Sequence, residues 1–309
     1  MSVLAIENLS KNYGGIKALQ NISFAVPPQT VFGILGPNGS GKTTLLGIVM
    51  DVLKASSGTY SWNGEQSSVA IRKSIGTLLE TPNFYHYLSA EDNLKIAAKI
   101  KGKGEDNIDN VLKVVNLYQR KSSKFSTYSL GMKQRLAIAS ALLGDPDILV
   151  FDEPTNGLDP AGIAEIRELI KDLNRKGKTI IMASHILDEV EKVCTHVAII
   201  QKGVLKTVGS VKEVMNNTSG GNTASTNVTL IELSADNNEL LKNILQEMNG
   251  ISQIVIIDSY LQITCNENIG AADVNRFCFE KGVVLKKLNE KHKSLETRFL
   301  EITGNQSDR

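Results

Sequence analysis

A glycine-rich loop near the N-terminus constrains the fold of this chain more than any other feature of the sequence. Gly36-Pro-Asn-Gly-Ser-Gly-Lys-Thr43 fits the pattern G-x-x-x-x-G-K-[ST] at every fixed position. An apolar strand is predicted before the loop, at 31–35, and a helix after it, at 43–53. Glycines let the backbone N–H groups face a phosphate, and the helix N-terminus adds partial positive charge. The sequence therefore predicts a phosphate-binding loop between a strand and a helix.

The loop also predicts which side chains hold the nucleotide and its metal ion. We expect Lys42 to contact the β- and γ-phosphates and Thr43 to offer its hydroxyl to Mg²⁺. The residues expected at ATP are Gly36, Pro37, Asn38, Gly39, Ser40, Gly41, Lys42, Thr43 and Thr44. An ordinary glycine-rich turn is the alternative, which the agreement of motif and context disfavours. Kinases, GTPases, helicases and transporters share such loops, so this one predicts only binding of a nucleoside triphosphate.

Strand-like and helix-like stretches alternate along residues 1–215. Short apolar runs at 148–151 and 179–183 suit buried strands, and 161–174 carries apolar residues at helical spacing. This alternation predicts an α/β core with a largely parallel sheet. A small, polar, glycine-containing stretch follows, and we expect a linker at 216–225.

Beyond this linker, residues 226–309 are predicted to form a small α+β accessory domain. Strand and helix patterns recur there in the order β-α-β-β-α-β, the ferredoxin-like arrangement, and a last helix is expected at 294–302. Nothing in this part of the sequence indicates a chemical site. A regulatory ligand-binding module, a dimer-stabilising tail and a spacer all remain open as its role.

Composition narrows the functional classes. Lys plus Arg is 34 and Asp plus Glu is 33, so no net basic field favours nucleic acid as a partner. Three cysteines without metal-site spacing favour a reducing compartment over a disulfide framework. The sequence has no signal-peptide pattern and no apolar run near the roughly 18 residues that span a bilayer. If the protein serves a membrane process, another chain must supply the membrane part.

An apolar strand ending in two acids provides the second candidate site. Asp147-Ile-Leu-Val-Phe-Asp152 is followed by Glu153. Asp152 can hold Mg²⁺, and Glu153 can orient or deprotonate an attacking water. The alternative is a plain helix cap before Pro154.

The segment Tyr128-Ser-Leu-Gly-Met-Lys-Gln-Arg135 precedes an Ala-, Leu- and Ile-rich helix and resembles the signature sequence of ABC transporter ATPases. In that family the signature caps the γ-phosphate held by the opposite subunit, which implies that role for Ser129 and Gly131. A hydroxyl, a glycine N–H and a helix N-terminus suit an anion. Taken alone, the segment would be interpreted as a serine-capped helix.

Further motifs of the same family follow in order. Tyr13 resembles the aromatic residue that stacks on adenine, although an exposed turn tyrosine is the alternative. Gly157-Leu-Asp-Pro160 resembles the loop that contacts the partner subunit, and His185 resembles the switch histidine at the γ-phosphate. The resemblance covers residues 1 to about 215. It implies a P-loop NTPase of the ABC type, with a mixed sheet core and a helical subdomain, working as one of two ATPase copies.

One departure from the family pattern points to a branch. Glu80 stands where most members carry Gln, and a carboxylate there would be a stronger Mg²⁺ ligand. Together with Phe84-Tyr85, the signature and the segment 294–303, Glu80 resembles the bacitracin-resistance and lantibiotic-immunity exporters. A one-residue variant in a general exporter is the alternative. The apolar residues after Glu80 (Phe84, Tyr85, Tyr87 and Leu88) either pack in the core or meet a helix of the membrane subunit.

The resemblance implies an ATPase that expels antimicrobial peptides, at the cytoplasmic face of the membrane and bound to permease subunits. A general ABC-2-type exporter is the first alternative, and a soluble ABC ATPase of ribosomes or DNA repair is the second. Soluble ribosomal members usually carry two cassettes in one chain, and repair members a coiled-coil insertion; this sequence shows neither. A P-loop kinase is disfavoured by Ser129, Gly131 and the ordered motifs after them.

Overall fold

The computed structural model describes residues 2–79, 83–216, 228–257, 259–266, 269–291 and 295–303. These residues form two compact units, one ending at Val214 and the other running from Met215 to Ile302, with Thr303 grouped with the first. The domain boundaries expected from the sequence stay a prediction. Most of the expected linker, from residue 217 on, lies outside the described residues.

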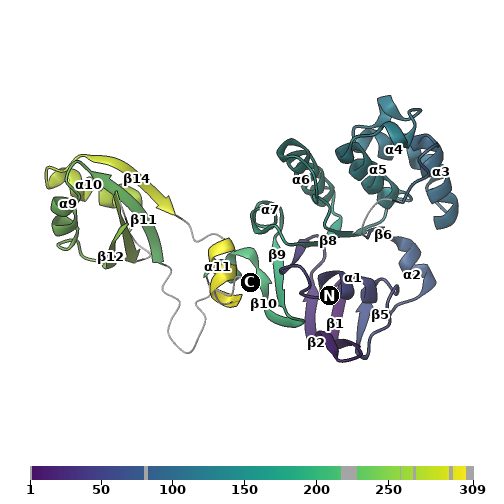
Figure 1. Ribbon diagram of the computed structural model, residues 1–309, viewed down its shortest axis with the longest axis horizontal. Helices are drawn as coiled ribbons and strands as arrows, with labels where there is room; N and C mark the ends of the chain where they lie inside the picture. Colours follow the sequence, from purple (N-terminus) through teal and green to yellow (C-terminus); the bar gives the residue numbers. More distant parts are fainter. Residues whose placement is uncertain are drawn as a thin grey trace. The chain divides into compact units, whose positions relative to one another are not determined.

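A six-stranded sheet forms the centre of the first unit, in the order β10-β9-β3-β8-β7-β6 (Figure 1). Its strands are β3 (Val31–Leu35), β6 (Ile75–Leu78), β7 (Ile148–Asp152), β8 (Thr179–Ser184), β9 (His196–Gln201) and β10 (Val204–Ser210). Strands β9, β3, β8, β7 and β6 pair in parallel, and β10 joins β9 antiparallel. Every residue of β3, β7 and β8 is buried, as expected for parallel strands covered on both faces. The predicted mixed sheet core is confirmed.

A second, antiparallel sheet packs against the first through helix α1 (Lys42–Val49). It contains β2 (Ile16–Val26), β1 (Leu4–Tyr13), β4 (Ser57–Trp62) and β5 (Glu65–Gln66), in that order. One hydrophobic cluster joins residues of both sheets and α1. Within it Phe24 and Phe32 stack at 5.4 Å between ring centroids, and the Trp62 indole donates to the Val49 carbonyl at 3.0 Å. The glycine loop is thus anchored between two sheets.

Helix α1 ends earlier than the sequence suggested. The helix predicted to reach residue 53 stops at Val49. Asp51 has a φ of 59°, and the amides of Val52 and Leu53 both donate to the Gly47 carbonyl. A left-handed residue at the end of a helix satisfies its last carbonyls and turns the chain away. The pattern predicted a longer helix because Met50 and Leu53, beyond Val49, also pack on the hydrophobic core.

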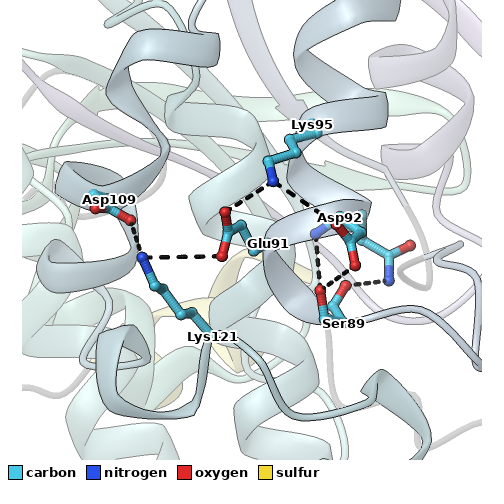
Figure 2. A network of polar contacts seen from close by, with 7 residues as sticks. Ser89, Glu91, Asp92, Lys95, Asp109 and Lys121 are labelled. Atoms are coloured by element: carbon cyan, nitrogen blue, oxygen red, sulfur yellow. Dashed lines mark hydrogen bonds and ion pairs between the residues drawn. The ribbon is translucent and has the colours of Figure 1, made fainter.

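Three helices form a separate group in the first unit: α3 (Ala90–Lys101), α4 (Ile108–Val114) and α5 (Leu130–Leu142). Figure 2 shows the polar network that joins the start of α3 to its neighbours. Ser89 caps α3 by accepting from the Asp92 amide, and Lys121 lies 2.8 Å from Asp109 and 3.9 Å from Glu91. Exposed pairs of this kind contribute little to the free energy of folding. The network therefore sets the geometry of the predicted helical subdomain more than its stability.

The remaining helices of the first unit are α2 (Val69–Ser74), α6 (Pro160–Arg175), α7 (Leu187–Val193) and α8 (Val211–Asn216). Single turns of 3₁₀ helix lie at 105–107, 118–120 and 125–127. Within the described part of the chain, every helix is too short or too polar to cross a membrane.

The second unit confirms the predicted β-α-β-β-α-β order. Its elements are β11 (Val228–Ala235), α9 (Asn238–Leu245), β12 (Ile251–Ile257), β13 (Tyr260–Asn266), α10 (Ala271–Glu280) and β14 (Leu285–Lys291), followed by α11 (Leu295–Thr303). The sheet order is β12-β13-β11-β14 with antiparallel neighbours. Alternate residues of β11 and β13 pack with α9 and α10 in a core that includes Ile231, Leu233, Leu261, Ile263 and Val274.

The cysteines give a direct test of this packing. Cys194, Cys265 and Cys278 are all free and buried. Burial raises the pKa of all three thiols, that of Cys265 to about 11. Since the thiolate is the reactive form, we expect a thiol reagent at neutral pH to label none of the three in the native protein. All three should react in denaturant. Rapid labelling of Cys194 in the native chain would contradict the packing of the first unit, and rapid labelling of Cys265 or Cys278 that of the second.

Candidate functional site

The glycine loop joins β3 to α1, and two of its glycines, Gly36 and Gly41, stand where a side chain would clash with the backbone. A Cβ at Gly36 would lie 2.2 Å from the carbonyl oxygen of Ile200. Gly41 has a φ of 108°, and a Cβ there would lie 2.6 Å from the carbonyl oxygen of Ala18. Gly41 is also the N-cap of α1 and offers no side chain to its first amides. The amides in the first turn of α1 can therefore donate to an anion that is not part of the chain.

Two further groups in the loop fit a bound polyphosphate. The Lys42 amine is buried and donates to two main-chain oxygens, those of Gly36 at 2.8 Å and Pro37 at 3.2 Å. Among the described residues the Ser40 hydroxyl is buried without a hydrogen-bond partner. Buried polar groups normally have partners, so the Ser40 hydroxyl suits a phosphate oxygen, and the Lys42 amine adds positive charge beside it.

The acids predicted at the end of a strand lie beside this loop. Asp152 is the last residue of β7 and is buried. Glu153 follows with a φ of 48°, and its amide donates to Ala183 on the neighbouring strand β8 at 3.0 Å. This left-handed backbone is uncommon for a glutamate and typical of functional sites.

Glu153 lies between the lysine of the loop and the predicted switch histidine. Its Oε1 is 3.6 Å from the Lys42 amine, and its Oε2 is 2.9 Å from Nδ1 of His185. The carboxyl ends of β3, β7 and β8 meet at one edge of the sheet, which brings the three side chains together although they are far apart in sequence. The arrangement can hold phosphate and place a carboxylate beside it.

A cavity of about 470 Å³ opens over the loop. The predicted residues that line it are Asn38, Gly39, Ser40, Gly41, Lys42, Thr43, Thr44 and Glu153. Four others were missed by sequence analysis: Ile16, Lys17 and Ala18 at the start of β2, and Lys202 in the β9–β10 turn. For Lys202 the sequence signal is the Lys-Gly pair at 202–203, which is typical of a tight turn but does not indicate ATP binding. We find no corresponding signal at 16–18.

Other predicted site residues lie away from this cavity or border it. Tyr13 is 45% exposed at the end of β1, with the Lys11 amine 4.9 Å from its ring centroid. It pairs with Ile16, which lines the cavity, so the residue predicted to stack on adenine is adjacent to the cavity. Glu80 lies outside the described residues.

The predicted signature residues form part of an exposed face, not of the cavity. Ser129 is the N-cap of α5, and its hydroxyl accepts from the Met132 amide at 3.3 Å. The next residue, Leu130, is 51% exposed and lies against the loop 157–160, since a Cβ on Gly157 would be 3.2 Å from Leu130. Asp159 in that loop caps α6 by accepting from Gly162. The start of α5 and the predicted partner-contacting loop are thus side by side.

Solved structures share this arrangement. The cbiO1 protein of Clostridium perfringens, part of the ABC transporter complex cbiONQ, is 33% identical with a TM-score of 0.63, over 69% of this chain and 90% of that chain. A dimeric, post-hydrolysis structure of the ATP-binding cassette MJ0796 with ADP and Pi is 25% identical with a TM-score of 0.60, over 67% of this chain and 98% of that chain.

The fold and the phosphate loop define an ATP-binding cassette of the P-loop NTPase class. The family model for ABC transporters matches residues 19–156. A bacitracin transport ATP-binding protein of Enterococcus faecalis is 31% identical over 98% of this chain and 96% of its own length. A lantibiotic transport ATP-binding protein of Streptococcus pyogenes is 40% identical over 65% of this chain and 88% of its own length. The chain belongs to the ATP-binding proteins of ABC transporters, a family that hydrolyses ATP for transport.

Proposed function

We propose that this chain is the ATPase of an ABC exporter and that it hydrolyses ATP only as one of two facing copies. The observation that carries the proposal is the separation of the site into two parts. Glu153 lies beside Lys42 and His185 at the loop, whereas Ser129 and Gly131 are on another face of the same chain and do not line the cavity. A second copy is needed to bring the signature helix over the γ-phosphate.

The loop residues bind and orient the nucleotide in this proposal. The amides at the start of α1 and the Lys42 amine hold the phosphates, and Tyr13 stacks on adenine. Glu153 accepts a proton from the attacking water, and His185 keeps that carboxylate oriented through its hydrogen bond. Closure by the second copy excludes bulk water from the phosphates.

Oxygen donors around the loop suit Mg²⁺, which prefers carboxylates, hydroxyls and phosphates. Thr43 and Asp152 are the residues of the described chain that would hold it, and Glu80 is the further ligand proposed from the sequence. Mg²⁺ would neutralise charge that develops on the phosphate oxygens.

The exposed start of α5 supports a head-to-tail pair. Ser129, Gly131 and the loop 157–160 present a hydroxyl, a helix N-terminus and a glycine-containing loop without burying them in their own chain. The similarity to a dimeric cassette with ADP and Pi also favours two copies. Each copy would then give its loop to one site and its signature to the other.

A cavity in the helical group is the proposed docking site for a membrane subunit. Its volume is about 490 Å³, and its lining residues are Asn83, Phe84, Tyr85, His86, Asn93, Ile96, Ala97, Ile100 and Ser140. Tyr85 and Tyr87 are 51% and 69% exposed, and their rings lie 5.9 Å apart. A groove that is polar on one part of its lining and apolar on another, with exposed tyrosines nearby, suits an amphipathic helix. Docking there would place the chain at the cytoplasmic face of the membrane.

The substrate we propose is a peptide antibiotic of the bacitracin or lantibiotic type, exported for resistance or self-protection. The nearly full-length similarity to a bacitracin transport protein supports this class. The Glu80 variant and the segment 294–303 support it from the sequence. A general exporter of another substrate is the alternative.

Resistance measurements test the substrate class. The chain, expressed with its neighbouring membrane genes in a sensitive Gram-positive host, should raise the inhibitory concentration of at least one peptide in a bacitracin and lantibiotic panel by about four-fold or more, since each turnover removes drug from the membrane. The Glu153→Gln variant should abolish the increase because it cannot cycle. If ATP is hydrolysed but no peptide in the panel loses potency, the peptide assignment is wrong and the general exporter is favoured.

A further inference from the structure

The hairpin between β9 and β10 turns on two residues with left-handed backbones. Lys202 has a φ of 50° and Gly203 a φ of 75°. Two-residue turns with both φ values positive favour Asn, Asp or Gly at the first position, because other side chains are strained there. A lysine at this position is locally unfavourable. Such strain persists where the surrounding structure fixes the backbone, and strained residues are often found at functional sites.

The turn is fixed to the phosphate loop and to β2. The Gly203 amide donates to the carbonyl of Ser40 at 3.0 Å, and the Gln20 amide donates to the carbonyl of Gly203 at 2.7 Å. The Gln20 side-chain amide donates to the carbonyl of Lys202 at 3.0 Å. A Cβ on Gly203 would lie 2.6 Å from the carbonyl oxygen of Ala18, so only glycine fits. These contacts hold the backbone of Lys202 beside the loop.

Lys202 also changes the charge around the nucleotide. The cavity over the loop is lined by three lysines, Lys17, Lys42 and Lys202, and by one carboxylate, Glu153. Lys42 is buried and tied to the loop carbonyls and Glu153. Lys202 is exposed, and among the described residues no carboxylate lies within ion-pair distance of its amine. Its charge is therefore available to a polyphosphate bound in the cavity.

We propose that Lys202 is a positioning residue for the phosphates of ATP, supplied by the hairpin turn in addition to the glycine loop. It favours nucleotides with more phosphate charge over those with less. The inference deepens the nucleotide site of the proposed function and rests on it. It assigns to residue 202 a contact that no sequence motif of this chain indicates.

Replacing Lys202 by Asn separates this role from folding, because Asn-Gly is the preferred sequence for such a turn. The dissociation constant of a non-hydrolysable ATP analogue should rise about five-fold at low ionic strength, the size expected for one exposed charge-assisted contact. The loss should shrink in high salt because ions screen the contact. Adenosine should bind as to wild type, and the melting temperature should stay equal or increase.

Two further variants complete the experiment. Lys206→Asn removes an exposed lysine of the same hairpin that does not line the cavity, and ATP affinity should not change. Lys202→Arg keeps the charge and should bind ATP as tightly as wild type. Unchanged affinity in Lys202→Asn, or an equal loss for adenosine, contradicts the inference. If the wild-type chain bound no ATP at all, the proposed function and the inference about Lys202 would both be wrong.

Discussion

Replacing Glu153 by Gln should lower ATP hydrolysis by two to three orders of magnitude and leave ATP bound, as expected when a general base is removed (roughly 10²–10⁴-fold). Gln has the same shape but cannot accept a proton from water. The strained backbone at Glu153 is no worse for Gln than for Glu. Phosphate release measures the rate, and size-exclusion chromatography with ATP should show a stable dimer that wild type forms only briefly.

The control for this variant is Glu168→Gln. Glu168 lies on α6, exposed, and its ion pairs with Lys171 and Arg175 are on the surface. Removing it should change neither hydrolysis nor dimerisation, because exposed pairs contribute little. Hydrolysis by Glu153→Gln at the wild-type rate would show that another group activates water, and that the contact between Glu153 and His185 is only structural.

Local signals allowed much of the nucleotide site to be predicted from sequence. The glycine loop, the acids at the end of β7 and His185 after β8 all lie at the carboxyl ends of short buried strands. Ligands of parallel α/β sheets bind at that edge, so the sequence predicts that these residues meet there. Parallel pairing of β7 and β8 then brings Glu153 and His185 into contact. The order of strands and helices in the second unit was likewise readable from alternating patterns.

The sequence could not predict contacts that depend on distant pairing. The turn that carries Lys202 is held beside the loop by contacts between distant segments: the amide of Gln20, 183 residues before Gly203, donates to the Gly203 carbonyl, and the Gly203 amide donates to the Ser40 carbonyl. No periodicity in either segment indicates this contact. The end of α1 was missed for a related reason: the turn at Asp51 is stabilised by backbone bonds to Gly47, while the apolar side chains continue.

A mixture of two inactive variants should recover ATP hydrolysis that neither shows alone. Lys42→Met removes the amine that we propose contacts the phosphates. Ser129→Asp keeps a good cap for α5, since Asp caps helices as well as Ser, but its charge repels a γ-phosphate. In a mixed dimer, one site combines both defects, and the other combines an intact loop with an intact signature.

Equal amounts of the two variants should give about a quarter of wild-type activity, because random pairing makes about half of the dimers mixed and each of these has one intact site. Strong coupling between the sites would lower this value but keep it above that of either variant. The measurement is phosphate release against mixing ratio, with a maximum near equal amounts. If activity instead follows the weighted average of the two variants, loop and signature act within one chain. The exposed face formed by Ser129, Gly131 and the loop 157–160 would then need another role.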